Sequence, residues 1–165
     1  MESAVELEII NELAAAKHKV ASIALRINPE VDAHTHAKIT TGMKENKFGI
    51  NLSQLGGVLD KLKEMKNVKL IGIHSHIGSQ ITDMSSFRNL VIRFNEIQEE
   101  LEAHGVTVEN LNFGGGLGID YYHPNHLSIP AFDNYFAAIH KLLQVRPGQQ
   151  VHFEPGRSIV AQCGT

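Results

Sequence analysis

Apolar residues recur along this chain in two alternating patterns. One has the spacing of a helix face and predicts helices over residues 3–17, 53–65 and 84–104, and from just after Pro130 to about residue 145. The other is a short run of aliphatic and β-branched residues, which is typical of a buried strand. It predicts strands over residues 20–27, 68–73, 108–113 and 150–154, with a further strand at 158–161.

The alternation of helices and strands predicts an α/β fold built on a parallel sheet. A complete (β/α)8 barrel takes about 250 residues and eight strands, whereas this chain has 165 residues and four or five predicted strands. The sequence therefore predicts either a small open sheet or a partial (β/α)8 TIM barrel. A polar segment over residues 30–46 is longer than most structureless loops, so we expect it to be functional.

Composition and charge exclude several classes of function. The net charge of -3 and the scattered Lys and Arg residues offer no basic surface, so no nucleic-acid partner is expected. No apolar run approaches the roughly 18 residues that cross a bilayer, and no membrane partner is expected. Cys163 is the single cysteine, which excludes an internal disulfide framework and favours a reducing, cytoplasmic location.

The segment His74–Gln80 directly follows the strand predicted at 68–73. Side chains two apart in a strand point to the same face, so His74 and His76 are expected to share one space. Together with Glu154, this pair could bind a metal ion such as zinc. Alternatively, one imidazole lies against an aromatic cofactor while Ser79 contacts its phosphate, or the two histidines line a core.

Two other polar features have simpler interpretations. His34 and His36 form a second His-x-His pair, but they lie in the polar segment, where solvated histidines are expected. Arg26 is a base at the end of an otherwise apolar strand, so it needs a carboxylate or a ligand as its partner.

A run of glycines, Gly114 to Gly116, follows the strand predicted at 108–113. Adjacent glycines let the backbone approach a ligand closely, and their N–H groups can bind an anion such as phosphate. The run lacks the spacing of a dinucleotide-binding motif and no P-loop lysine follows it. The alternative is a tight turn that packs a helix onto a strand.

The sequence Glu-Pro-Gly-Arg at residues 154–157 ends the last of the four main strands. Gly156 allows a sharp bend that can return Arg157 to the same end of the sheet, where its planar fork of donors suits phosphate or carboxylate. Glu154 could be a general base, a metal ligand or the partner of a protonated ring nitrogen. An ordinary ion pair at a strand end is the alternative.

Taken in order, these segments resemble the pyridoxal-phosphate-dependent decarboxylases with an alanine-racemase-like barrel, and most closely the diaminopimelate branch of that family. The resemblance covers most of the chain. Its matching segments are residues 26–29, 40–42, 47–50, 74–80, 112–118 with Tyr121, and 154–160.

The resemblance implies a role for each candidate residue. His76 would stack on the pyridine ring of pyridoxal 5'-phosphate, and Glu154 would bind the ring nitrogen and keep it protonated. Arg157 would hold the phosphate and also face the substrate. The other expected phosphate contacts are Ser79, Gly114, Gly115, Gly116 and Gly156. The family's Schiff-base lysine has no counterpart here, because Lys38, Lys47 and Lys69 stand in the wrong context.

The resemblance also implies the whole protein's activity. Residues 1–165 are expected to be the central part of a pyridoxal-phosphate-binding TIM-barrel domain, without its N-terminal strands and its C-terminal β domain. The parent enzyme would convert meso-2,6-diaminopimelate, a small amino-acid substrate, to L-lysine and CO2 as a cytoplasmic homodimer, and this chain alone would be inactive. The alternatives are a metal-dependent TIM-barrel hydrolase using His74, His76 and Glu154, or a non-catalytic module that binds a phosphate ligand.

Overall fold

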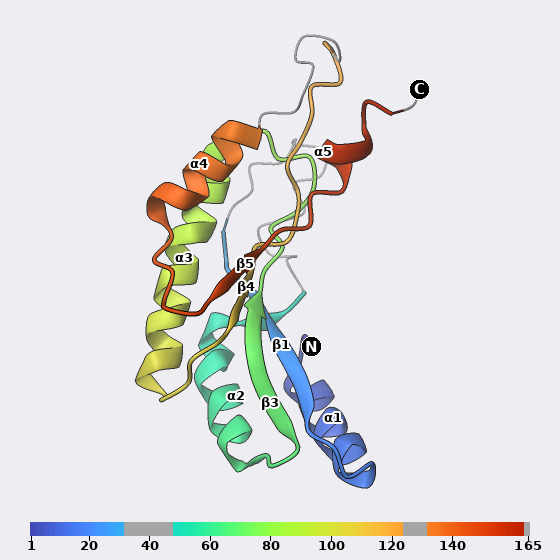
Figure 1. Cartoon of the computed structure of the whole chain (residues 1–165), viewed down its shortest axis with the longest axis vertical. Helices are drawn as coiled ribbons and strands as arrows, with labels where there is room; N and C mark the ends of the chain where they lie inside the picture. Colours follow the sequence, from blue (N-terminus) through green and yellow to red (C-terminus); the bar gives the residue numbers. More distant parts are fainter. Residues whose placement is uncertain (32–47, 124–131, 164–165) are drawn as a thin grey trace.

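The computed structural model describes residues 1–31, 48–123 and 132–163 of the chain. In these ranges, helices and strands alternate as the apolar pattern predicts (Figure 1). The elements are α1 (Ala4–Ala16), β1 (Ala21–Asn28), β2 (Ile50–Asn51), α2 (Leu52–Glu64), β3 (Val68–His74), α3 (Met84–Ala103), β4 (Asn110–Asn112), α4 (Phe132–Leu142), β5 (Gln150–His152) and α5 (Arg157–Val160).

The strands form one parallel sheet in the order β2-β1-β3-β4-β5. The pairing of β1 with β3 contains a bulge, because Ile23 lies opposite Leu70 whereas the next residue, Ala24, lies opposite Gly72. All strands run in the same direction, so their carboxyl ends meet at one end of the sheet, the upper end in Figure 1. In parallel α/β folds this end carries the ligand site.

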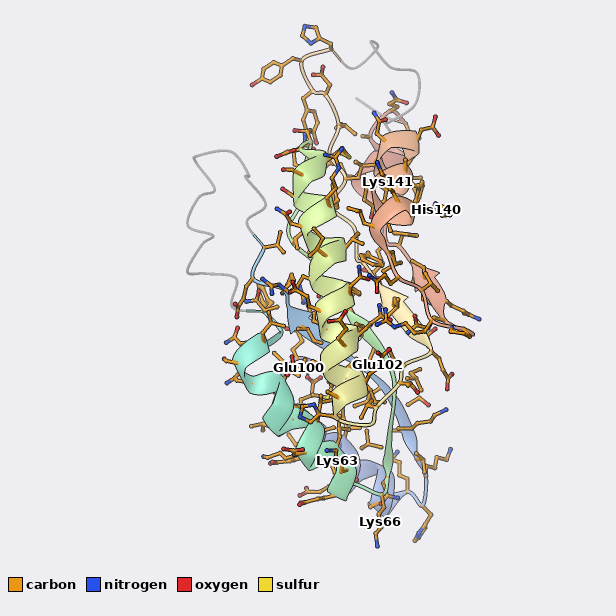
Figure 2. All side chains as sticks on the ribbon, turned by 90° about the vertical axis from the view of Figure 1, so that its left-hand side faces the viewer. Lys63, Lys66, Glu100, Glu102, His140 and Lys141 are labelled. Carbon is orange, nitrogen blue, oxygen red and sulfur yellow. The ribbon has the colours of Figure 1, made fainter. Side chains whose placement is uncertain are left out.

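One face of the sheet is covered by helices and contains the hydrophobic core. Figure 2 looks onto this helical layer, in which α3 and α4 lie side by side. Phe94 of α3 stacks on Phe113, which follows β4, with 4.1 Å between ring centroids. Phe87 of α3 meets Tyr135 of α4 edge to face at 4.7 Å. These aromatic contacts fix the helical layer against the strand that leads into the glycine run.

Two short elements differ from the predicted pattern. The apolar run at residues 158–161 predicts a strand, but Arg157–Val160 is the short helix α5. Ile159 and Val160 are 59% and 61% exposed there, so the run that indicates a buried strand is not buried. Strand β2 was not predicted, because two residues are too few to show a periodicity.

Residues 32–47 lie outside the described part of the chain, and with them His34, His36 and most of the polar segment. Among the described residues, no helix is both long and apolar enough to span a membrane.

Candidate active site

The register of the sheet sets polar side chains from three strands in a row near their carboxyl ends. Arg26 of β1 lies opposite His74 of β3, and His74 lies opposite Asn112 of β4. Their neighbours Leu25, Ile73 and Leu111 are almost fully buried in the core. Since alternate residues of a strand face opposite ways, the polar row faces away from the helical layer.

Glu154 completes this row from the end of β5. Its Oε1 accepts a hydrogen bond from the Asn112 side-chain amide at 2.8 Å, and its Oε2 lies 3.9 Å from His74 Nε2. The Glu154 side chain is 57% exposed, so one carboxylate oxygen remains open toward the end of the sheet. The predicted meeting of His74 and Glu154 at one place is therefore observed.

His76 is half-buried beside the glycine run. Its Nδ1 accepts a hydrogen bond from the N–H of Gly115 at 3.3 Å, which assigns the ring proton of a neutral imidazole to Nε2. Burial lowers the pKa of His76, the Arg26 guanidinium lowers it further, and the Glu154 carboxylate opposes both effects. A neutral ring suits contact with the face of an aromatic ligand.

His74 has a different environment from His76. Its Nε2 is buried and makes no hydrogen bond within the described residues. Burial is the main cause that lowers the pKa of His74, and the nearby Glu154 carboxylate opposes it. Such an orphaned polar atom at a strand end is typical of a site that is completed by a ligand or a water molecule.

The glycine run is held between two other backbone segments. A Cβ on Gly115 would lie 2.2 Å from the carbonyl oxygen of Glu154, and one on Gly116 would lie 2.3 Å from that of Gly78. Any side chain at Gly115 or Gly116 is therefore excluded for steric reasons, which the alternative of a tight turn between a strand and a helix also predicts. The N–H of Gly114 donates to Asn112 Oδ1, whereas within the described residues the N–H of Gly116 donates to no protein acceptor. Gly116 thus has a backbone donor free for an anion.

Two side chains that suit phosphate come from the segments after β3 and β5. Arg157, at the start of α5, lies with its Nη2 3.3 Å from Ser79 Oγ. Its Nη1 donates to the hydroxyl of Tyr121, and its guanidinium carbon is 5.7 Å from the centre of that ring. A Cβ on Gly156, immediately before Arg157, would meet no atom within 4 Å. An arginine joined to a hydroxyl in this way is suited to an anion.

These groups fit pyridoxal phosphate by their chemistry. Ser79, Arg157 and the N–H of Gly116 offer donors for a phosphate, His76 offers a flat neutral ring, and Glu154 offers a carboxylate to a protonated ring nitrogen. The metal alternative gains no support, because within the described ranges no three His, Cys, Asp or Glu side chains gather closely enough to hold a metal ion.

The sequence pattern indicates most of the site residues, but it does not indicate the residues that form hydrogen bonds and ion pairs with them. Asn112 and Tyr121 lie in segments that match the family, but the sequence pattern indicates no role for them, although each is polar and follows or ends a strand. Arg26 was expected to need a carboxylate or a ligand, and it pairs with Glu2 at 2.6 Å while its guanidinium lies 5.3 Å from the centre of the Phe48 ring. Both partners are remote from Arg26 in the sequence, so no local pattern indicates them.

Comparison with known proteins agrees with this site. The family model described as "Pyridoxal-dependent decarboxylase, pyridoxal binding domain" matches residues 1–161. The chain belongs to this family of pyridoxal-binding domains. The cofactor indicated by the resemblance is thereby confirmed as that of the family.

Relatives named diaminopimelate decarboxylase match nearly the whole chain. The protein of that name from Bacteroides thetaiotaomicron is 58% identical over 100% of this chain and 43% of its own length. The crystal structure of diaminopimelate decarboxylase from M. jannaschii has a TM-score of 0.81 and 37% identity, over 98% of this chain and 38% of the other. The Helicobacter pylori enzyme, complexed with L-lysine, has a TM-score of 0.82 and 35% identity, over 96% of this chain and 39% of the other.

The relatives show which larger fold the five-stranded sheet belongs to. Their similarity, together with the all-parallel sheet, confirms the predicted fold class as part of a (β/α)8 barrel. The chain spans about two fifths of the length of the relatives it matches, with 43% for the Bacteroides protein.

Proposed function

We propose that the polypeptide containing this chain is a pyridoxal-phosphate-dependent decarboxylase that converts meso-2,6-diaminopimelate to L-lysine and CO2. The observation that carries the proposal is the gathering of an open carboxylate, a neutral imidazole and an anion-binding group at one end of a parallel sheet. The names of the relatives supply the substrate, and the L-lysine in the H. pylori complex agrees with the product.

In this proposal each residue has a defined task. When bound, pyridoxal phosphate supplies an electron sink for the pair left behind as CO2 departs. The Glu154 carboxylate holds the proton at the ring nitrogen, because an adjacent negative charge favours the cationic form. His76 orients the ring. The proposed phosphate contacts are Ser79, Gly114, Gly115, Gly116, Gly156 and Arg157. Among the glycines of the run, Gly116 supplies the free N–H donor, because the N–H groups of Gly114 and Gly115 already donate to Asn112 and His76. Arg157 also faces the amino-acid substrate.

The proposal includes segments beyond this chain. None of the lysines that the structure describes lies at the carboxyl end of a strand, and Lys69 at the opposite end is paired with Glu109 at 2.7 Å. We propose, as the family resemblance implies, that the lysine that attaches the cofactor comes from an earlier strand of the barrel. We further propose that the full protein has a C-terminal β domain and acts as a homodimer in the cytoplasm.

Glu154→Ala in the full polypeptide tests the assigned chemistry. The variant should retain pyridoxal phosphate, because Ser79 and Arg157 remain, and its turnover should fall by about 100-fold or more, the usual scale for a lost electrostatic contact in catalysis. Cofactor absorbance and CO2 release measure the two effects. Glu109→Ala, at the opposite end of the sheet, is the control and should change neither. Normal turnover by Glu154→Ala would contradict the proposal.

Substrate specificity separates the proposal from its alternatives. The full polypeptide should release CO2 from meso-2,6-diaminopimelate in preference to L-ornithine or L-arginine. Cofactor binding without turnover of any of these would support the non-catalytic phosphate-binding module. Activity that a chelator abolishes, without a cofactor absorbance band, would support the metal-dependent hydrolase.

A further inference from the structure

Asn112 joins the glycine run to the carboxylate of the site. Its Oδ1 accepts a hydrogen bond from the N–H of Gly114 at 2.8 Å, and its Nδ2 donates to Glu154 Oε1 at 2.8 Å. The N–H of Glu154 donates to the carbonyl of Gly114, also at 2.8 Å. The three residues therefore form a closed ring of hydrogen bonds.

The ring fixes the orientation of the Asn112 amide. A rotated amide would set its carbonyl oxygen against the Glu154 carboxylate and its NH2 group against the Gly114 N–H. Both contacts would be repulsive, so only the observed orientation satisfies the two partners. Because Asn112 also ends a strand that is paired on both sides, its backbone has little freedom to move.

Glu154 has no comparable restraint on its other oxygen. Oε2 lies 3.9 Å from His74 Nε2, which is beyond hydrogen-bond distance, and the side chain is largely exposed. A glutamate has several rotatable bonds, and an exposed one samples many orientations. The Asn112 contact to Oε1 is therefore the one direct hydrogen bond that the described residues make to this carboxylate.

We propose that Asn112 is a positioning residue, which holds Glu154 so that Oε2 faces the ring nitrogen of the cofactor while the phosphate is held at the glycine run. This inference rests on the proposed function, in which Glu154 pairs with that nitrogen. The neutral Asn112 amide can hold the Glu154 carboxylate without adding a charge beside it. An aspartate in its place would keep an acceptor for Gly114 but would set a second carboxylate against Glu154.

The other charged or titratable groups near Asn112 come from the two neighbouring strands, from β1 and from the segment after β3, where His76 accepts a hydrogen bond from the N–H of Gly115. His74 lies opposite Asn112 on β3, and His152 lies opposite it on β5. His152 Nε2 is 2.9 Å from Asn110 Oδ1, two residues before Asn112 on the same face of β4. Arg26 lies opposite His74 on the far side. Asn110 therefore provides a matched control that shares the strand, the face and the residue type but not Glu154.

The test uses the full polypeptide with pyridoxal phosphate labelled with 15N in its ring. Asn112→Ala should shift the ring-nitrogen signal toward the unprotonated form and lower kcat by about 10- to 100-fold, the effect of losing one hydrogen bond to a charged group. The KM and the affinity for the cofactor should change little, because the phosphate contacts remain. Asn110→Ala should leave the nitrogen signal and kcat as in the parent.

Asn112→Asp keeps the contact to Gly114 and so isolates the contact to Glu154, even if Asn112→Ala fails to fold. It should add an ionisation to the pH profile of kcat that the parent lacks, since two adjacent carboxylates share a proton. An unchanged nitrogen signal and pH profile in this variant would overturn the positioning role. If the parent itself shows an unprotonated ring nitrogen, the proposed function fails first, and the two failures are thus distinguished.

Discussion

His74 and His76 leave the same strand end, yet they have different surroundings. His76 receives the N–H of Gly115, whereas the buried Nε2 of His74 makes no hydrogen bond in the described part of the chain. Both imidazoles favour the neutral form because burial penalises their charged form. His74, to which the proposed function gives no task, therefore has a buried ring nitrogen without a hydrogen bond among the described residues, 3.9 Å from the Glu154 carboxylate.

These lowered pKa values predict acid-sensitive stability. As the pH falls below the unfolded value of 6.5, the unfolded chain binds protons that the folded chain takes up only at lower pH. Stability is therefore full above pH 6.5 and is lost as the pH falls toward the lowered folded-state pKa. His74→Gln should lose less stability than the parent between about pH 7.5 and pH 5, measured by urea unfolding.

The control for this experiment is His140→Gln, on the exposed side of α4 (Figure 2). It should show the same loss of stability on acidification as the parent. If His74→Gln and His140→Gln lose equal stability, His74 does not contribute to the acid sensitivity.

At the residue scale, sequence reasoning could predict where the site lies but not its hydrogen bonds. His76, Glu154 and Arg157 each follow a strand, and parallel strands end together, so their meeting place was predictable. The Asn112 contacts depend on the register of β3, β4 and β5, and register is set by tertiary pairing. The proposed roles of the individual site residues stay predictions until they are tested.

At the scale of elements, the loops after β3 and β4 form one interlocked unit. Ile81 and Leu117 form a parallel bridge, and the N–H of Ile81 donates to the Gly116 carbonyl at 2.8 Å. The side-chain amide of Gln80 pairs with both backbone groups of Ile119. Backbone pairing thus resumes beyond the strands, and glycines are required where the two loops approach each other.

Gly115→Ala should destabilise the protein by about 2 kcal/mol or more, because its Cβ would overlap the carbonyl of Glu154 and force the backbone to move. Gly57→Ala is the matched control: Gly57 lies inside α2, and nothing lies within 4 Å of the place that a Cβ would take there. It should stabilise the protein by about 0.5–1 kcal/mol through helix propensity. Equal unfolding midpoints for the two variants in urea would contradict the packing account.

Phe113→Ala should cost about 3–5 kcal/mol of unfolding free energy, since this fully buried ring anchors the start of the glycine run on Phe94. Phe136, which is 40% exposed on α4, is the comparison, and Phe136→Ala should cost clearly less. Thermal unfolding followed by circular dichroism measures both. If Phe113→Ala lost less unfolding free energy than Phe136→Ala, the glycine run would not depend on the packing of Phe113 against Phe94.

The main helices and strands were predictable because their apolar periodicity is long and regular. The failures were short elements. The run at residues 158–161 has a length at which strand and helix cannot be told apart by periodicity, and it falls largely in the helix α5. The two residues of β2 pair only because the fold brings them beside Ile27 and Asn28.

At the scale of the molecule, the sheet has one covered and one polar face. The helical layer buries the apolar face, while the opposite face carries the row of Arg26, His74 and Asn112. In a closed barrel such a face lines the interior, where the layers of side chains come from alternate strands. The number of strands that complete it could not be predicted from apolar patterns within this chain.

The chain by itself should form no specific Schiff base with pyridoxal phosphate. No lysine among the described residues lies at the end of the sheet that holds the site, and Lys69 lies at the other end. After borohydride reduction, mass spectrometry should find no single preferred lysine in this chain, but one in the full polypeptide, outside residues 1–165. CO2 release by this chain alone would contradict the expectation.

The bulge between β1 and β3 decides which face of the sheet carries the histidines. If the pairing continued regularly past Leu70, Arg26 would lie opposite Ile73, and His74 would turn toward the helices. Deleting Ile71, the extra residue of the bulge, would keep His74 opposite Arg26, whereas inserting one residue between Gly72 and His74 would reverse its direction. The direction of His74 therefore depends on whether the number of residues between the bulge and His74 is odd or even. The chemistry of this end of the sheet thus rests on the length of the strand as well as on its side chains.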